Sequence, residues 1–237
     1  MALKTAMKND PAPATRERDM TTSEIYEKIY AAILEHRLRP GVKLVEERLA
    51  EIFSVSRPRI REVIARLAHE QIVELYPQRG AYVAKPSPAK AADVLEARRL
   101  IEPALVTRLI SNLTPDKLEQ LRAHAGQEQE ARSRNDKRAI IRLAGEFHML
   151  LADMAGNGEL ARAMRELSTL TCLVIFLYNV PTSTSCRHDE HAHIIDAIAR
   201  GDAALARRLT LEHLEHIEAS LQLVHEEDEI DLADVFK

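Results

Sequence analysis

Three arginines stand at alternate positions in the segment 56–62, which reads SRPRIRE. Ser56 is a residue type that caps helix N-termini, so Arg57, Arg59 and Arg61 are expected at the start of a helix. Guanidinium groups at such an end can contact bases and phosphates when the helix enters a DNA groove. The segment therefore predicts a DNA-recognition helix.

A second basic feature follows about seventeen residues later. Arg79 and Gly80 lie between two short apolar runs, 72–75 and 81–84, which are typical of the strands of a hairpin. A cationic hairpin tip beside a recognition helix can lie on the phosphate backbone as a wing. We expect Arg79 and Gly80 to contribute to the same DNA interface.

Histidines are the other side chains that can do chemistry. Helical spacing puts His148 on one face with Ile141 and Leu151, so its imidazole is expected to point into apolar surroundings. The same spacing groups His191 with isoleucines and His213 with Leu209 and Ile217. Three imidazoles inside a helical bundle are candidates for a metal or ligand site.

The turn at Gly201-Asp202 adds geometry to the histidine pattern. If it closes an antiparallel helical hairpin, His191 and His213 face each other, because each stands 11 residues from position 202, about 16 Å along a helix. The same arithmetic pairs His188 with His216, one turn further out. Spacing alone leaves both pairs open.

These side chains must be carried by helices and a small hairpin. In the first third, Thr21 or Thr22 can cap a helix that ends before Pro40, and helices at 46–53 and 57–70 follow. Beyond residue 87, caps and breaks predict six helices, at 88–111, 115–134, 136–155, 158–179, 183–200 and 202–225. The expected fold is mainly α: a winged helix-turn-helix followed by an all-α bundle.

Composition agrees with that fold. Aromatic residues make up 4% of the chain and Trp is absent, which favours helices over β-sandwiches or barrels. No apolar run approaches the roughly 20 residues that span a bilayer. Two cysteines, Cys172 and Cys186, make neither a disulfide framework nor a thiolate zinc cluster, so a reducing cytoplasm is the expected compartment and no membrane contact is expected.

Charge is distributed unevenly between the expected domains. Residues 20–86 hold 11 Lys/Arg and 9 Asp/Glu, whereas residues 87–237 hold 18 and 25. The relative positive charge thus coincides with the expected recognition helix. We divide the chain into a disordered arm at 1–19, a DNA-binding domain at 20–86, a helical domain at 87–225 and an acidic tail at 226–237.

The first third resembles the DNA-binding domain of GntR-type bacterial transcription regulators. The resemblance covers about residues 22–86, and the matching positions are Leu38, Pro40, Gly41, Leu44, Glu46, Leu49, Ala50, Phe53, Val55, Ser56, Arg57, Arg61, Glu62, Arg79, Gly80 and Val83. It implies that Arg57 and Arg61 contact operator DNA and that Gly80 allows close backbone approach. Pro58-Arg59 replaces the usual Thr-Pro, so Arg59 is an additional cation that can alter operator preference.

The last two thirds resemble the FadR-type C-terminal domain, the FCD class. The matching positions are Phe147, His148, Gly156, Asn157, Glu190, His191, Gly201, Asp202 and His213. Many members hold a divalent metal through one Asp and three His, which implies His148, His191 and His213 as ligands. The Asp would stand one turn before His148, where this chain has Ala144.

Two interpretations of the altered metal site remain open. Three neutral imidazoles, completed by water or an effector carboxylate, are a workable ligand set for zinc or nickel. Alternatively, the histidines contact an organic ligand directly. Arg98 matches a cavity-facing arginine of the FCD class and can grip the carboxylate of a small organic acid, or it can simply pair with Glu102 on its own helix.

These features predict a ligand-responsive transcription regulator. We expect a repressor that binds a palindromic double-stranded operator as a homodimer, with half-sites about one DNA turn apart, and senses a small organic carboxylate. The alternative is a metal-dependent hydrolase in which the three histidines hold a water-activating metal, although no general base is evident beside them. A purely architectural DNA-binding protein is a third hypothesis, which the buried histidines do not favour.

Overall fold

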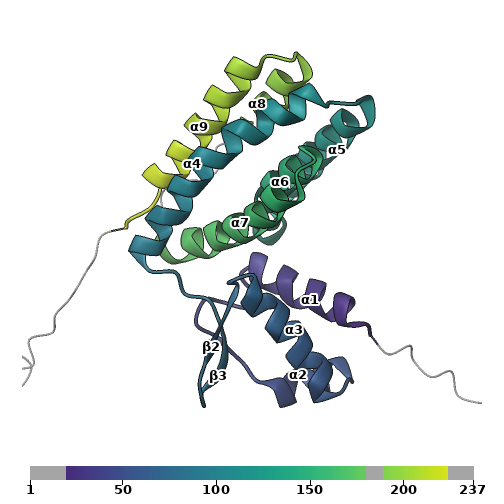
Figure 1. Ribbon diagram of the computed structural model, residues 1–237, viewed down its shortest axis with the longest axis vertical. Helices are drawn as coiled ribbons and strands as arrows, with labels where there is room; N and C mark the ends of the chain where they lie inside the picture. The colour runs from purple at the N-terminus through teal and green to yellow at the C-terminus, as the bar shows by residue number, and fades with distance from the viewer. Residues whose placement is uncertain (1–19, 180–188, 224–237) are drawn as a thin grey trace, which may run out of the picture.

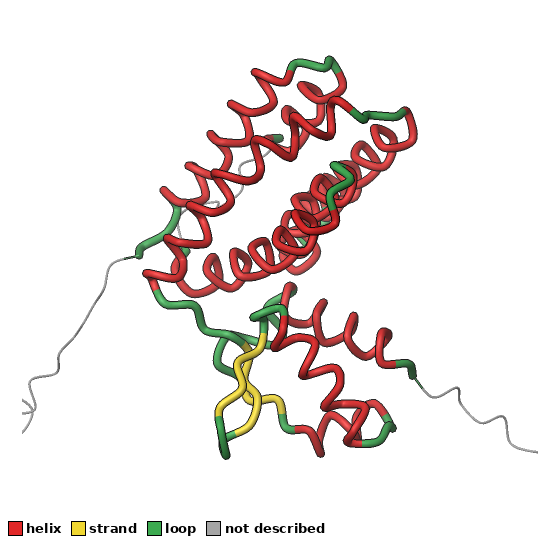
Figure 2. Tube along the Cα trace, viewed as in Figure 1, coloured by secondary structure: helices red, strands yellow, loops and turns green. Residues whose placement is uncertain are grey.

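The computed structural model describes residues 20–179 and 189–223, which form a small lower body and a larger helical body (Figure 1). Within these residues the chain is mainly α-helical with one three-stranded sheet, which confirms the predicted fold class; Figure 2 shows the strands in the lower body. The lower body contains, in chain order, α1 (Thr22–Leu34), β1 (Lys43–Leu44), α2 (Glu46–Phe53), α3 (Arg57–His69), β2 (Val73–Tyr76) and β3 (Gly80–Val83).

Local sequence explains where α1 begins. Thr21 accepts a hydrogen bond from the backbone N–H of Glu24, and the Glu24 carboxylate accepts one from the backbone N–H of Thr21, at 3.2 and 2.7 Å. This reciprocal capping box selects Thr21 over Thr22 as the cap. The helix ends at Leu34, and His36 then takes a left-handed conformation with φ of 55°.

A tight turn joins α2 to α3. Ser54 ends α2 in the left-handed region, and Ser56 precedes α3 in an extended conformation. Ser56 occupies the cap position, but its side chain makes no capping hydrogen bond, so the expected cap is only positional. Ile60 and Leu67 have no exposed surface, and full burial of each stabilises the fold by about 1.5–3 kcal/mol.

The predicted hairpin forms the wing. β2 and β3 pair antiparallel, from Val73 opposite Val83 to Tyr76 opposite Gly80. Gly80 has φ of +97°, a conformation that favours glycine. The two-residue strand β1 adds to the free edge of β3, with Lys43 opposite Tyr82. The sequence analysis did not predict this third strand, because two residues carry no readable periodicity.

The larger body is the predicted helical bundle. Its helices are α4 (Pro88–Ser111), α5 (Pro115–Ser133), α6 (Lys137–Met154), α7 (Gly158–Tyr178), α8 (Glu190–Ala199) and α9 (Ala203–Ala219). α9 ends six residues before the predicted limit, because the chain then turns and Leu221 forms a bridge with Asn179. The predictions for 1–19, 183–188 and 226–237, and for Cys186, lie outside the described residues.

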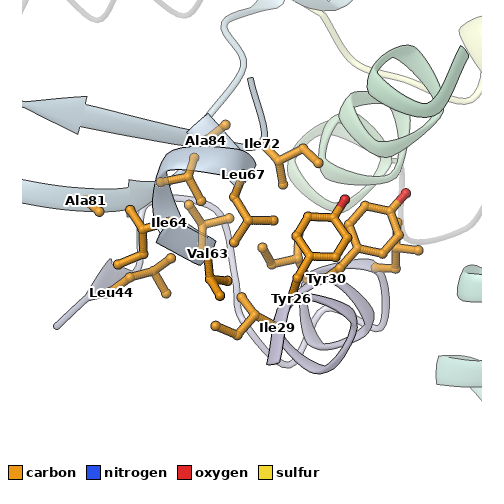
Figure 3. Packing of buried hydrophobic residues seen from close by; sticks show 14 of the residues in the cluster. Tyr26, Ile29, Tyr30, Leu44, Val63, Ile64, Leu67, Ile72, Ala81 and Ala84 are labelled. Atoms are coloured by element: carbon orange, nitrogen blue, oxygen red, sulfur yellow. The ribbon is translucent and has the colours of Figure 1, made fainter. Parts of the chain in front are cut away.

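The two bodies share one apolar core. Tyr26 and Tyr30 of α1 stack in the cluster between α1, α3 and the wing (Figure 3). The same cluster continues into the bundle through Met149 of α6 and Leu173 of α7. α1 therefore packs on α6 and α7 instead of moving on a free linker. No helix among the described residues is long and apolar enough to cross a membrane.

Candidate functional site

The N-terminal end of α3 is open to solvent. The side chains of Arg57 and Arg61 are 55% and 60% exposed, and both point to the carboxylate of Glu46 at the start of α2, at 3.8 and 2.7 Å. Exposed ion pairs of this kind contribute little stability, so phosphate groups can replace Glu46 as the partner. The two arginines lie one helical turn apart on the same side of α3.

Arg59 takes a different direction from its neighbours. Its guanidinium donates a hydrogen bond to the backbone carbonyl of Met20 at 3.0 Å, and the side chain is half-buried. It therefore lies against the segment before α1, whereas Ser56 stays exposed near Arg57. The structure thus separates Arg59 from the arginine pair with which the sequence analysis grouped it.

Arg79 and Gly80 lie at the tip of the wing. The backbone N–H of Arg79 donates to the carbonyl of Tyr76, which closes the turn. Lys43 of β1 lies over the ring of Tyr82, with its ammonium 5.7 Å from the ring centre. Lys43 is thus an exposed cation near the wing that the sequence analysis missed, because only the pairing of β1 brings it there.

The three predicted histidines meet inside the bundle. His148 comes from α6, His191 from α8 and His213 from α9, and each is at least 96% buried. One possible ligand atom from each ring lies within 4.8 Å of the other two. The Nε2 atoms of His148 and His213 are 3.2 Å apart. The rings of His191 and His213 are 4.8 Å apart between centres, as the hairpin arithmetic predicts.

Each imidazole is anchored by a carboxylate through Nδ1. The Nδ1 atom of His148 lies 2.7 Å from a carboxylate oxygen of Glu102 in α4. The corresponding distances are 2.8 Å from His191 to Glu128 of α5 and 2.7 Å from His213 to Glu190 of α8. Such partners orient metal-binding imidazoles and increase their basicity.

Burial and neighbouring charges set the protonation of this cluster. Burial lowers the pKa of His148 to about 3, so the ring is neutral at pH 7. Burial opposes ionisation of Glu128, but its contacts with His191 and Arg132 lower its pKa to about 2. Burial also opposes ionisation of Glu102, yet the charge of Arg98 and the contact with His148 keep that pKa well below the usual range.

The hydrogen-bond directions fit a cation at the cluster. An ionised carboxylate can only accept, so a neutral His148 or His213 carries its hydrogen on Nδ1. Their Nε2 lone pairs then face each other across 3.2 Å, an arrangement that repels unless a cation lies beside both. Two nitrogen ligands of a tetrahedral zinc ion lie roughly 3.3 Å apart, close to this separation.

A cavity of about 450 Å³ opens beside the histidines. It is lined by His148, His191 and His213, by Arg98, and by aliphatic side chains that include Ile141 and Ile175.

Arg98 is 1% exposed and donates from Nε to Glu102 at 2.5 Å. The ion pair that the sequence offered as an alternative is therefore present. However, the Nη2 atom of Arg98 is buried without a hydrogen-bond partner. The guanidinium thus retains a free donor at the cavity that it lines.

Ala144 also lines the cavity, one turn before His148. Its methyl group leaves open the space that a carboxylate side chain would fill. Glu146 does not substitute for it, because its carboxylate pairs with Arg142 at 2.9 Å on the half-exposed side of α6. The outer histidine pair cannot be compared fully: His188 lies outside the described residues, and His216 contacts the other oxygen of Glu190.

Comparisons with known proteins bear on both bodies. Residues 21–83 match the family model described as bacterial regulatory proteins, gntR family, and residues 93–216 match the FCD domain model. An HTH-type transcriptional regulator in an unstable DNA locus of Streptomyces ambofaciens is 30% identical over 195 residues, covering 81% of this chain and 80% of its own. The HTH-type transcriptional repressor RspR of Escherichia coli K12 is 26% identical over 206 residues, covering 86% and 90%.

A solved structure gives the same fold. The chain of McbR/YncC from Escherichia coli superimposes with a TM-score of 0.73 at 19% identity, covering 84% of this chain and 95% of its own. The order of elements therefore agrees across both bodies. Two family models, a relative at 30% identity and the winged helix with its bundle lead to one conclusion: this chain belongs to the GntR family of bacterial regulatory proteins, carries an FCD domain, and is a DNA-binding transcription regulator.

Proposed function

We propose that this regulator is a repressor that binds a palindromic operator as a homodimer and that a small organic carboxylate in the bundle cavity sets its DNA affinity. Ser56, Arg57 and Arg61 would contact one half-site, with Arg79 and Gly80 of the wing on the flanking phosphates. Two exposed guanidinium groups at the start of α3 support this assignment. Arg59 would join them once it leaves the carbonyl of Met20.

The division of labour follows the two bodies. Residues 20–86 would bind DNA, and residues 87–225 would bind the effector and the second subunit. The regulator would act in the cytoplasm, because its operator lies there. The name of the relative RspR, a transcriptional repressor, supports repression.

The unpartnered Nη2 atom of Arg98 carries the effector proposal. A buried guanidinium donor without a partner costs free energy, and a carboxylate would provide the missing acceptor with good geometry. The aliphatic side chains of the cavity would surround the rest of the molecule. An effector with one anionic end and an aliphatic body is therefore the best match.

His148, His191 and His213 would hold a divalent metal through their Nε2 atoms. The convergence of these atoms and the three carboxylates behind them fit zinc or nickel. When bound, the metal would supply a Lewis-acidic position for an anionic ligand. Ala144 leaves room beside it, so the effector carboxylate can lie between the metal site and Arg98.

α7 provides the connection to DNA binding. The side chain of Cys172 lines the cavity, and the carbonyl of the same residue lies 2.9 Å from Nε2 of His36, just after α1. A ligand that favours one position of α7 therefore favours one position of α1. Only this difference in affinity between two arrangements can shift DNA binding.

The effector assignment is tested with small carboxylates. We expect thermal stabilisation by aliphatic acids, with affinity reduced about tenfold or more in Arg98→Lys, because lysine keeps the charge but lacks the planar fork. Arg99→Lys is the matched control, since Arg99 pairs with Glu218 outside the cavity. Unchanged affinity in Arg98→Lys would refute the role of Arg98.

The metal assignment has its own measurement. Protein purified without a histidine tag should contain, or take up on titration, one divalent metal per chain. Absence of metal by elemental analysis both before and after titration would reject the three-histidine site and leave the direct-contact interpretation.

Neither alternative function gains support from the comparisons. A hydrolase needs a general base near the reacting atom, and Glu102, Glu128 and Glu190 are each already bonded to an imidazole. The family matches also favour a regulator over a hydrolase. An architectural role would leave the cavity and the free donor of Arg98 without purpose.

A further inference from the structure

Two buried side-chain polar atoms lack a hydrogen-bond partner within the described parts of the chain. One is Nη2 of Arg98, and the other is Oγ of Ser168 on α7. Both residues line the same cavity. A ligand that satisfied only Arg98 would leave the serine hydroxyl buried and unpaired, which is unfavourable.

The neighbours of Ser168 show that its hydroxyl is exceptional. Thr169 and Thr171 each donate to a backbone carbonyl four residues earlier in α7, at 2.8 Å. Ser168 has the same option in principle, yet its hydroxyl makes no such bond and is 1% exposed. The hydroxyl is therefore available to a molecule in the cavity, where it can donate and accept one hydrogen bond.

The remaining wall restricts the chemistry of that molecule. Ile140, Ile141, Ile175 and Ile217 cover much of the cavity and offer no hydrogen bonds. Between these aliphatic surfaces, a second polar group on the ligand is favourable only where it meets Ser168.

We propose that Ser168 selects the effector by bonding a hydroxyl or oxo group on the aliphatic chain of the carboxylate that Arg98 holds. The effector class is then an aliphatic hydroxy- or oxo-carboxylate, and a plain fatty acid is disfavoured. This inference rests on the proposed function, because it takes the carboxylate site at Arg98 as given. Sites built to bond such a group discriminate strongly against analogues that lack it.

The test compares pentanoate with its 2-, 3- and 4-hydroxy derivatives and with 4-oxopentanoate, each titrated by calorimetry into the metal-loaded full-length protein. Wild type should bind at least one derivative about tenfold or more tighter than pentanoate. Ser168→Ala should reduce that preference to about twofold or less. Its thermal midpoint without ligand should not fall, because the substitution removes an unpaired buried hydroxyl.

Thr171→Val is the matched control. It also removes a hydroxyl from a residue that lines the cavity, but that hydroxyl is already bonded to the carbonyl of Leu167, so the preference should persist. A preference that survives in Ser168→Ala, or equal binding of all five acids by wild type, would overturn the role of Ser168 while leaving the carboxylate site intact.

Failure of the carboxylate site itself gives a different pattern. If no acid binds wild type at millimolar concentration, or if Arg98→Lys binds all of them like wild type, the proposed effector site is wrong and the Ser168 inference falls with it. Titrations of wild type, Ser168→Ala, Thr171→Val and Arg98→Lys together therefore separate the two failures.

Discussion

At the residue scale, Glu102 connects the two parts of the ligand site. One carboxylate oxygen accepts from Arg98 at 2.5 Å and the other lies 2.7 Å from Nδ1 of His148. The same carboxylate thus orients the guanidinium and an imidazole. Its buried negative charge also offsets the positive charge of Arg98, which makes a second anion tolerable only at the free Nη2 donor.

The DNA contact of Arg61 gives the first prediction. Arg61→Ala should weaken operator binding at least about tenfold, because a charge-assisted contact is lost, with the thermal midpoint nearly unchanged since its ion pair is exposed. Arg48→Ala is the control, as Arg48 is an exposed arginine on α2 paired with Glu51. Fluorescence anisotropy with a labelled operator measures both variants, and equal losses in the two would remove the specific role of Arg61.

The carboxylates behind the histidines give the second prediction. Glu128→Gln should lower metal affinity about 10–100-fold, because the amide orients the His191 ring less strongly and lowers its basicity. Glu130→Gln, on the same helix but paired with Arg134 at the surface, should leave metal affinity unchanged. Competition with a chelator measures the affinities, and a Glu128→Gln value equal to wild type would contradict the role of this carboxylate.

Sequence reasoning reached the site unevenly at this scale. It identified the three histidines and their burial, because helical spacing and the Gly201 turn constrain which faces meet. It did not identify Glu128 as a partner of His191, because the two are 63 residues apart and on different helices. The free hydroxyl of Ser168 was equally unreadable, since it depends on a side-chain direction that no spacing encodes.

At the scale of elements, the α6–α7 contact is the tightest part of the cavity wall. A Cβ atom added at Gly145 of α6 would lie 2.8 Å from Sγ of Cys172 on α7. Glycine inside a helix is otherwise unfavourable, so its presence here reflects the close approach of the two helices. Both residues line the cavity, and the contact therefore fixes its width.

This contact gives the third prediction. Gly145→Ala should lower the thermal midpoint, by an amount equivalent to about 1–3 kcal/mol, because the added methyl overpacks the interface. Gly126→Ala, in α5 with nothing within 4 Å, should raise it through better helix propensity. Adding Cys172→Ala to Gly145→Ala should restore much of the loss. Differential scanning calorimetry measures all variants; stabilisation by Gly145→Ala would contradict the close approach.

Helices were more predictable than the sheet. Caps and breaks such as Thr114-Pro115 and Gly201-Asp202 placed most helix limits within two residues, because these residues act locally. β1 was missed because its two residues become a strand only through pairing with β3. The end of α9 was misplaced because the bridge between Leu221 and Asn179 is a tertiary contact.

At the scale of the whole molecule, α1 is the joint between cavity and DNA. The Tyr30 hydroxyl lies 2.8 Å from Oγ1 of Thr169 on α7, deep in the core shared by the two bodies. His36 bonds the carbonyl of Cys172 a turn away. A movement of α7 caused by a ligand therefore reaches the helix that packs against the recognition helix α3.

This joint gives the fourth prediction. Tyr30→Phe should reduce the factor by which an effector acid changes operator affinity, because it removes a polar link between α1 and α7; couplings of this kind are typically about 1–3 kcal/mol. Tyr26→Phe is the control, since the Tyr26 hydroxyl contacts Glu70 inside the lower body. Anisotropy titrations with and without the acid provide the ratio. A full effector response in Tyr30→Phe would exclude this route.

The central claim is that paired copies of α3 read a palindromic DNA site. Selection of bound sequences from a random duplex library by the full-length protein tests it most directly. The account predicts enrichment of an inverted repeat with half-site centres about 10 base pairs apart, or a multiple of one DNA turn. The Arg57→Ala, Arg61→Ala double variant should enrich nothing. Enrichment of no sequence by wild type, or of the same sequence by the double variant, would contradict the claim.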